Sequence, residues 1–360
     1  MASPSFITQS DLTRQIKDKA LDLGFDLVGI APAQDSPELA FLERWLDTGY
    51  AGEMHYLRRN LDRRRDIQQV VPGAQSVVVC GLNYDTAYPY STEQEDANRG
   101  WVARYAWGAD YHDSMQEKLA QLQAFVVDLA PSDGKFYVDT GPVVERVYAK
   151  YAGLGWFGKN TCMLNQRLGS WILLGELILT IPLHYDQPTL DHCGTCTRCI
   201  DACPTDAILE PYVLDSRRCI SYLTIELKGS IPEEFRPQMG HHIFGCDICQ
   251  DVCPWNRKRV LATEEAVQPR PDQVHPPLAD LARLTPAEFR QRFRGTPLER
   301  TKRRGVLRNV CVAMGNSGNT AFIPWLEELV HDEEALIREH AAWALTQLHQ
   351  TPASEPPSVA

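Results

Sequence analysis

The sequence predicts a mixed α/β fold that carries a cysteine-rich insert and ends in a purely helical segment. Three observations support this prediction. Strand-like and helix-like stretches alternate over about residues 1–185, as in layered α/β domains. Eight of the 11 cysteines lie between Cys193 and Cys253. From about residue 301 only helical patterns follow. A length of 360 residues fits two or three domains.

The α/β region divides into four helical and four strand-like stretches. Apolar residues at helical spacing predict helices over residues 11–23, 38–46, 111–129 and 144–152. Ser10 or Asp11 can cap the first helix, and Gly24 ends it. Short apolar runs predict strands over residues 25–30, 76–82, 135–138 and 171–181. The continuous apolar character of residues 76–82 indicates a buried strand.

The end of the chain reads differently. Residues 265–280 are rich in proline and are interpreted as a linker. Helices are predicted over residues 301–314, 320–330 and 333–349. The stretches that begin at Arg308 and Arg338 resemble each other at a period of about thirty residues, which suggests a HEAT-type helical pair. Fewer than three such repeats rarely stand alone, so this segment should pack on the main body. The tail after Thr351 is expected to be disordered.

The cysteine spacing predicts two iron–sulfur clusters. The run Cys193-Gly-Thr-Cys196-Thr-Arg-Cys199-Ile-Asp-Ala-Cys203-Pro has the C-x2-C-x2-C-x3-C-P spacing of bacterial ferredoxins, whose fourth cysteine ligates the other cluster. We therefore expect two [4Fe–4S] clusters with crossed ligation. The first would use Cys193, Cys196, Cys199 and Cys253, and the second Cys203, Cys219, Cys246 and Cys249.

Other uses of these cysteines fit less well. Structural zinc sites use paired CxxC motifs, but a triple CxxCxxC followed by xxxCP is not a usual zinc pattern. Disulfides are disfavoured because the N-terminus lacks a basic region followed by an apolar one, as an export signal would have. A radical-forming cluster needs CxxxCxxC, and the position that would complete it after Cys199 and Cys203 is Asp206.

Composition limits the cellular location and the binding partners that can be expected. No apolar run reaches the ~18 residues of a membrane span, so a cytoplasmic protein without a membrane partner is expected. The sequence has no long apolar repeat of the kind that packs against a partner chain, so a monomer is expected. The net charge of −11 argues against a general nucleic-acid coat but allows one local basic patch.

Asp139 ends a predicted strand and opens the sequence Asp139-Thr-Gly-Pro142. Ligands of α/β sheets bind at the carboxyl ends of strands. A carboxyl group there, shielded by a flat cofactor, could be protonated near neutral pH and act as a general acid. It could equally be the N-cap of the following helix.

The stretch from Arg290 to Arg308 holds eight basic residues and one acid, Glu299. It could form a phosphate-binding face or a solvated helix surface. The aromatic residues Trp101, Tyr105, Trp107 and Tyr111 are expected to fill the core rather than line a ligand cavity.

Gly153-Leu-Gly155-Trp-Phe-Gly158 matches GxGxxG but follows a helix, so a helix stop and tight loop is expected instead of a dinucleotide site. Cys80 and Cys311 should be core residues, and Cys162 could face the ligand.

Several of these motifs together resemble the epoxyqueuosine reductase family. They are the ferredoxin-like insert, Arg104-Tyr-Ala-Trp-Gly-Ala-Asp-Tyr-His112, Asp139-Thr-Gly-Pro142, Gly158-Lys-Asn-Thr161 and Cys219-Ile-Ser-Tyr-Leu223. The resemblance runs from about residue 10 to 350. It implies a cobalamin-dependent oxidoreductase that completes queuosine synthesis in tRNA anticodon loops, with an external electron donor.

The resemblance also implies domains and site residues. A nitroreductase-like α+β domain over residues 1–185, completed by part of 215–245, would hold cobalamin. Residues 186–262 would form the ferredoxin-like domain, 275–350 the HEAT-like domain and 351–360 the tail. Asp139 would donate the proton. Cobalamin contacts would fall on Arg64, Ala103, Asp139, Met163, Leu174, Ser221 and Asp247. The tRNA phosphates would contact Arg300, Lys302, Arg303, Arg304 and Arg308.

Asp110-Tyr-His112 begins like the DxHxxG signature that supplies a lower histidine to cobalt in other cobalamin proteins, but Met115 breaks it. A base-off cobalamin without a lower histidine is therefore expected. Two other functions stay open at this point. One is a reductive dehalogenase, which is usually exported. The other is an electron-transfer module, which would leave Asp139 and the basic helical end unexplained.

Overall fold

The fold is built around an antiparallel sheet of four strands. A computed structural model describes residues 7–350, and the tail after Thr351 lies outside the described residues. The strand order is β1 (Leu27–Pro32), β2 (Ser76–Asn83), β7 (Ile172–Leu179) and β4 (Gly134–Tyr137). All neighbouring strands in this sheet pair antiparallel. Every residue of β2 is buried, which confirms the prediction from its continuous apolar run.

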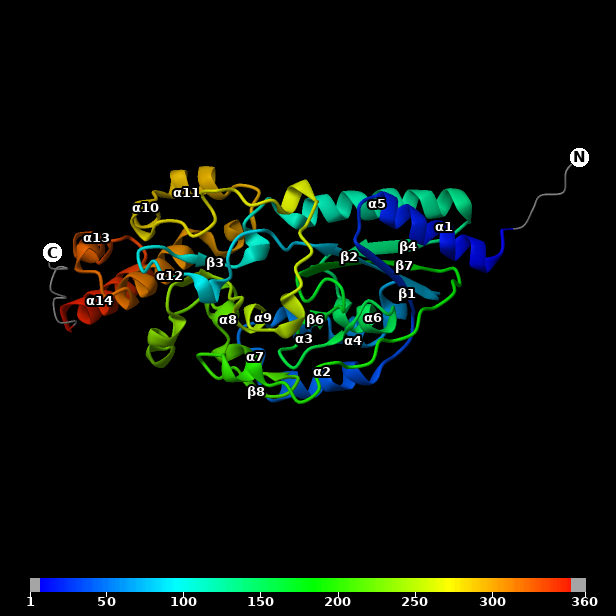
Figure 1. Cartoon of the computed structure of the whole chain (residues 1–360), viewed down its shortest axis with the longest axis horizontal. Coiled ribbons are helices and arrows are strands. Elements are labelled where there is room, and N and C mark those ends of the chain that lie inside the picture. Colours follow the sequence, from blue (N-terminus) through cyan, green and yellow to red (C-terminus); the bar gives the residue numbers. More distant parts are fainter. Residues whose placement is uncertain (1–6, 351–360) are drawn as a thin grey trace, which may run out of the picture.

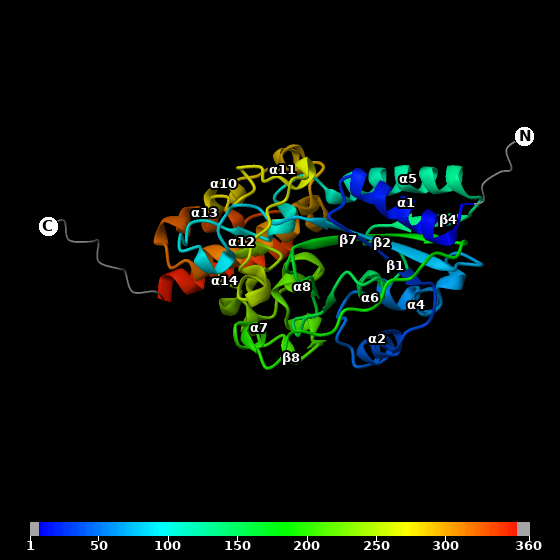
Figure 2. The same cartoon turned by 45° about the vertical axis from the view of Figure 1, so that its right-hand side comes forward.

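Helices cover both faces of this sheet. On one face, α1 (Gln9–Asp22) and α5 (Tyr111–Leu129) lie side by side (Figures 1 and 2). On the other, α6 (Glu145–Tyr151) packs against β1, β2 and β7. Helices α2, α3 and α4 follow beyond it, over Pro37–Asp47, Tyr56–Arg59 and Leu61–Arg65. The four predicted helices are confirmed. The first begins earlier than predicted, because Thr8 rather than Ser10 or Asp11 caps it.

The cysteine-rich insert is joined to the first domain by a short parallel pairing. Strand β10 (His242–Phe244) pairs with β3 (Trp101–Val102). The insert also contains α7, β8, β9, α8 and α9, over Arg198–Asp201, Ile208–Glu210, Val213–Leu214, Ile220–Ile225 and Ile248–Asp251. The GxGxxG sequence ends α6 with Gly153 at φ +74° and continues into a hairpin of β5 (Trp156–Phe157) and β6 (Met163–Leu164). The predicted helix stop is confirmed.

The C-terminal part is helical, as predicted. It comprises α10 (Leu278–Ala282), α11 (Pro286–Phe293), α12 (Lys302–Asn316), α13 (Ile323–Leu329) and α14 (Ala335–Gln350). Helix α12 is buried without interruption from Gly305 to Gly315, with α13 and α14 packed nearby (Figure 1). At Gly315 an added Cβ would lie 2.9 Å from the Cα of Ala344, so this glycine permits the close approach of α12 and α14.

The proline-rich connection before α10 is packed on the body. Arg270 donates its backbone N–H to the carbonyl of Trp107 at 2.8 Å, and Val274 is buried in the same apolar cluster as Trp101 and Trp107. These tryptophans are 2% and 0% exposed, so the prediction that they fill the core is confirmed. Among the helices of residues 7–350, none is both long and apolar enough to cross a membrane.

Candidate active site

Four of the predicted cluster ligands surround one cavity. A cavity of about 270 Å³ is lined by Cys193, Cys196, Cys199 and Cys253, together with the apolar side chains of Leu164 and Trp255. This arrangement suits a cluster with a ligand at each corner.

The other four predicted ligands come together from separate segments. Burial, and then the neighbouring thiols of Cys219 and Cys203, raise the pKa of Cys246 well above its usual range. The pKa of Cys249 is raised well above its usual range by a hydrogen bond with Cys162 and by burial. Thiols crowded in this way ionise readily only when metal cations lie among them. The chemistry of this set therefore also fits a cluster.

The motif Gly158-Lys-Asn-Thr161 ties the first domain to both sets of thiols. Lys159 donates its Nζ to the carbonyls of Gly194 and Cys196 at 2.7 and 3.0 Å. Asn160 donates its side-chain amide to the carbonyl of Cys249 at 3.2 Å. Two adjacent side chains thus position one loop of each set.

Asp139 lies just beyond the end of β4, between two cationic side chains. Its Oδ2 is 3.7 Å from Nε2 of His112, which lies in the first turn of α5, and 3.6 Å from Nη1 of Arg300. Arg300 also pairs with Glu226 at 2.5 Å. The Asp139 side chain is 48% exposed, so this cluster of charges is open to a ligand. Because α6 has its N-cap at Val144, the alternative that Asp139 caps this helix is wrong.

The proton at this site resides on histidine. The adjacent imidazolium of His112, and then the charge of Arg300, hold the pKa of Asp139 below its usual value, although partial desolvation acts in the opposite direction. Burial would lower the pKa of His112, but its contacts with Asp110 and Asp139 outweigh this and raise the pKa to about 9. These shifts favour a carboxylate at Asp139 beside an imidazolium at His112, and protonation of Asp139 under a shielding flat cofactor stays a prediction.

Two buried groups hold the loop that presents Asp139. Arg64 donates Nη1 to the carbonyls of Gly141 and Val143 at 3.1 and 3.3 Å. Glu145 accepts a short hydrogen bond from the backbone N–H of Asp139, whose φ is +57°. That φ is rare for a residue with a side chain and persists only where the surroundings fix it.

A second carboxyl group lies beneath Glu145. Glu176 on β7 is 0% exposed, and among the described residues no donor reaches its oxygens apart from the carboxyl group of Glu145. Burial and the nearby charge of Asp139 raise the pKa of Glu145 to about 7. Burial and the carboxyl group of Glu145 raise the pKa of Glu176 well above its usual value. Two adjacent buried carboxyl groups cannot both ionise, so the pair shares a proton.

The residues expected to contact cobalamin fall into two neighbouring groups. Met163 and Leu174 share an apolar cluster with the Asp139 loop residue Val143. Ala103 donates its backbone N–H to the carbonyl of Phe244 at the end of β10. Asp247, three residues later, accepts a 2.7 Å hydrogen bond from the N–H of Arg104, which follows Ala103. Ser221 lies in the first turn of α8. The contact between Cys162 and Cys249 joins the two groups.

The basic stretch divides into buried and exposed members. Arg308 is 0% exposed and donates to the carbonyls of Leu223, Leu227 and Gly229, so its expected role as a phosphate contact is wrong. Arg303 is 19% exposed and pairs with Asp332 at 2.7 Å. Lys302 and Arg304 are exposed, and in the described chain their side chains make no ion pair or hydrogen bond. At the start of α12, Lys302 and Arg304 are therefore available to a ligand, and the half-exposed Arg300 beside them is paired with Glu226 and Asp139.

Several site residues were not identified from the sequence. His112 was considered only as a cobalt ligand, and Cys162 only as a residue that could face the ligand. Lys159, Asn160 and Glu145 carry no recognisable spacing, because their partners lie in segments that are distant in sequence or depend on the loop conformation. The charge of His112 could have been suspected from Asp110 two residues before it.

Family models match two parts of the chain. Residues 192–256 match the "4Fe-4S double cluster binding domain", and residues 64–140 match "Epoxyqueuosine reductase QueG, DUF1730". Among curated relatives, the epoxyqueuosine reductase of Xanthomonas campestris is 42% identical over 94% of this chain and 96% of its own length. That of Escherichia coli K12 is 40% identical over 96% and 92%.

Solved structures of epoxyqueuosine reductases are also similar to this chain. A crystal structure of epoxyqueuosine reductase with a tRNA-Tyr epoxyqueuosine-modified stem loop has a TM-score of 0.88 and 31% identity, over 95% of this chain and 91% of that chain. A Bacillus subtilis epoxyqueuosine reductase, with its catalytic aspartate loop swung out of the active site, has a TM-score of 0.86 and 31% identity over the same shares.

Proposed function

This chain belongs to the epoxyqueuosine reductase family, and from that premise we propose how its residues reduce the epoxide of epoxyqueuosine in tRNA to the alkene of queuosine. The reaction consumes two electrons and two protons and releases water. The observation that carries the proposal is the exposed cluster of Asp139, His112 and Arg300.

We propose that the two sets of thiols hold [4Fe–4S] clusters and that cobalamin binds between the sheet and the insert. When bound, these groups supply single electrons and a nucleophilic reduced cobalt. Cobalamin would contact Arg64, Ala103, Asp139, Met163, Leu174, Ser221 and Asp247. A protonated His112 has no lone pair at Nε2 for cobalt, which supports binding without a lower histidine. We also assign the α/β domain to the nitroreductase type and α12–α14 to the HEAT type.

The chain's own groups would deliver the proton. His112 holds it at Nε2, 3.7 Å from Oδ2 of Asp139, and Asp139 passes it to the oxygen that leaves when the epoxide opens. Arg300 would stabilise negative charge on that oxygen. The loop swings in the Bacillus subtilis relative. Here Arg64 and Glu145 would hold the corresponding loop in its productive position.

A stem loop must present its base unstacked to reach this site. Lys302 and Arg304 at the start of α12 are exposed and make no ion pair among the described residues, so they would contact its phosphates, with the half-exposed Arg300 beside them. An electron-transfer module alone would not need the Asp139 cluster, and family membership favours the reductase over a dehalogenase.

The test is anaerobic turnover of an epoxyqueuosine-containing stem loop, with queuosine measured by mass spectrometry. Asp139→Asn should lose at least about 100-fold in rate and still bind cobalamin and tRNA. Asp133→Asn, an exposed change just before the same strand, should behave as wild type. Full activity of Asp139→Asn would refute the assigned role.

A further inference from the structure

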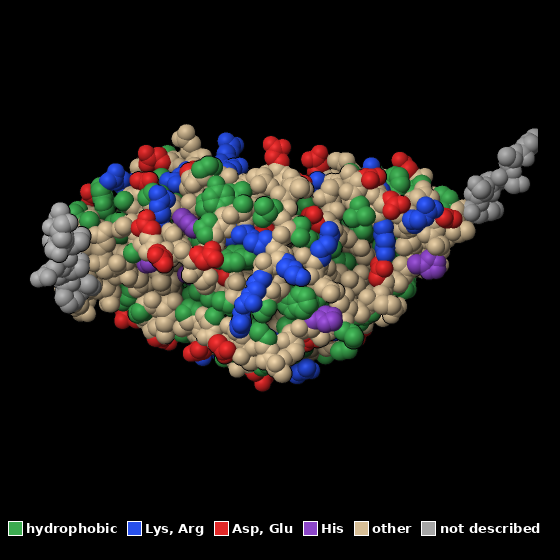
Figure 3. Space-filling view, viewed as in Figure 1, with side chains coloured by type: hydrophobic (Ala, Val, Ile, Leu, Met, Phe, Trp, Pro, Cys, Tyr) green, Lys and Arg blue, Asp and Glu red, His purple; other side chains and the backbone are tan. Residues whose placement is uncertain are grey.

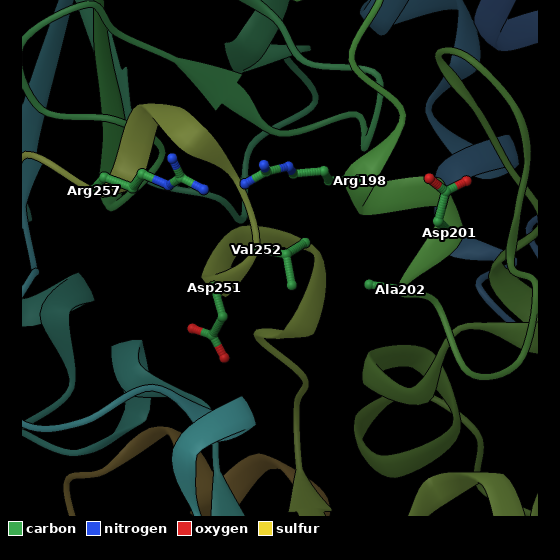
Figure 4. A pocket seen from close by; sticks show the side chains of 6 residues that line it. All are labelled: Arg198, Asp201, Ala202, Asp251, Val252 and Arg257. Carbon is green, nitrogen blue, oxygen red and sulfur yellow. The ribbon is translucent and has the colours of Figure 1, made fainter.

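A groove of about 440 Å³ crosses the surface of the insert (Figure 4). One wall is α7, which contains Cys199, and the other is α9, which contains Cys249, with the turn that follows it. Ala202 and Val252 line the groove and immediately precede Cys203 and Cys253. The groove therefore lies directly over segments that carry ligands of both proposed clusters.

The groove carries positive charge that the chain leaves without counter-ions. Arg198 and Arg257 point toward each other across it, while the carboxyl groups of Asp201 and Asp251 point away (Figure 4). Both arginines and the adjacent Lys258 are exposed. Within residues 7–350 none of these three side chains makes an ion pair or hydrogen bond.

The two acids that line the groove do not pair with these arginines among the described residues. Asp201 accepts a hydrogen bond from Oγ1 of Thr197 at 2.9 Å. Asp251 is 8% exposed and accepts from the N–H of Ser91 at 2.8 Å. On the face seen in Figure 3, Lys and Arg side chains gather over the region of α7 and α9, although the whole chain has a net charge of −11. Facing guanidinium groups without a counter-ion favour a ligand that brings negative charge.

We propose that this groove is the docking site of a small acidic one-electron carrier protein, an inference that rests on the proposed function. Electrons must enter close to the clusters, and both walls of the groove carry cluster ligands. Each encounter oxidises the carrier by one electron and reduces one cluster by one electron. Two encounters and two protons then supply one epoxide reduction with release of one water.

The experiment compares two reductants for the reconstituted enzyme, dithionite and a reduced acidic ferredoxin, with the modified stem loop as substrate. Arg198→Glu/Arg257→Glu should raise the KM for the ferredoxin about tenfold or more at low ionic strength and leave the dithionite-driven rate unchanged. Arg198→Lys/Arg257→Lys should stay close to wild type. Arg44→Glu, an exposed arginine on α2, controls for the general loss of positive charge.

Three results would overturn the docking site. They are an unchanged KM for the ferredoxin in the charge-reversed variant, an equal loss of rate with both reductants, and a loss of stem-loop affinity, which would assign the groove to RNA. Iron content and the visible spectrum of each variant show whether the clusters are intact. Failure of the proposed function looks different, because wild type would then form no queuosine even with dithionite.

Discussion

His112 is held between two carboxylates, with Nδ1 2.6 Å from Asp110 and Nε2 3.7 Å from Asp139. These contacts raise its pKa from the usual 6.5 to about 9. The folded state therefore binds this proton more tightly than the unfolded chain does. The stabilisation is complete below about pH 6.5 and is lost as pH rises through about 9. The same window governs any reaction that takes its proton from the imidazolium.

We expect kcat/KM for the stem loop to fall as pH rises through about 9, because His112 then loses its proton. His112→Gln should lower the rate at pH 7.5 about 100-fold and abolish this alkaline limb. The measurement is a pH–rate profile with dithionite, with the circular dichroism spectrum taken at each pH to separate inactivation from unfolding. An unchanged alkaline limb in His112→Gln would assign the proton to another group.

Glu176 has the opposite effect on stability, because it is buried in the central part of the sheet and, among residues 7–350, only the carboxyl group of Glu145 is within hydrogen-bond reach of it. Its pKa is raised well above 4.5 by burial and by Glu145. The unfolded chain releases this proton above about pH 4.5, whereas the folded protein keeps it. The folded state is thus penalised increasingly as pH rises from that value toward the folded pKa, by up to about 1.4 kcal/mol per pH unit.

We therefore expect Glu176→Gln to gain stability relative to wild type as pH increases from 6 to 8.5. The glutamine amide can still donate to Glu145 without a proton from solvent. Urea unfolding at the two pH values measures the difference, and Glu117→Gln, an exposed change on α5, should show no such trend. A gain that is equal at both pH values would mean that Glu176 is ionised in the folded state.

At this scale the sequence could indicate Asp139 but not its charge. The position after a strand and before Gly141-Pro142 was visible along the chain. The protonation state depends on His112 and Arg300, which lie 27 residues before and 161 residues after it and meet only in the fold. The same reason explains the error at Arg308, which reads like Arg304 in sequence but points inward.

At the scale of elements, α12 connects the helical segment to the insert through hydrogen bonds. Arg308 donates to the carbonyls of Leu223, Leu227 and Gly229 at 2.6–2.8 Å. Its neighbour Asn309 donates to the carbonyls of Thr224 and Ile243. These bonds cap the end of α8, whose start follows the cluster ligand Cys219. Arg308 thus stabilises the helix that follows the cluster ligand Cys219.

Arg308→Met should destabilise the protein by about 3 kcal/mol or more, because buried carbonyls lose their donors while the apolar stem is kept. Arg304→Met, one turn earlier and exposed, should stay within about 0.5 kcal/mol of wild type. Urea unfolding followed by circular dichroism measures both. Similar values for the two variants would show that the buried guanidinium contributes little.

Elements with strong local patterns were predictable, and the pairings between them were not. The periodicity of α5 predicted both of its ends, and the cysteine spacing grouped thiols that do line one cavity. The order β1-β2-β7-β4 and the pairing of β3 with β10 join residues far apart in sequence. No local pattern encodes which edges meet, nor the ties from Lys159 and Asn160 to the cysteine loops.

At the scale of the whole molecule, two sets of exposed, unpaired cations among residues 7–350 lie near the proposed sites of this acidic chain. One is the groove of Arg198 and Arg257 over the cluster segments. The other is Lys302 and Arg304 at the start of α12, close to Arg300 and therefore to Asp139. The backbone of Lys302 has φ +61°, a conformation of the kind that concentrates at functional sites. Separate entry points for electrons and for RNA would let both bind together.

Lys302→Glu/Arg304→Glu should therefore weaken stem-loop binding and lower the slope of log affinity against log salt by about one for each phosphate that the variant no longer binds. The KM for the reduced ferredoxin should not change. The groove variant Arg198→Glu/Arg257→Glu should show the reverse behaviour, with full stem-loop affinity. Fluorescence anisotropy of a labelled stem loop at about 50 to 200 mM salt gives the slopes. If both variants were impaired in both properties, the two cation sets would act as one general field, and the division between an electron surface and an RNA surface would fail.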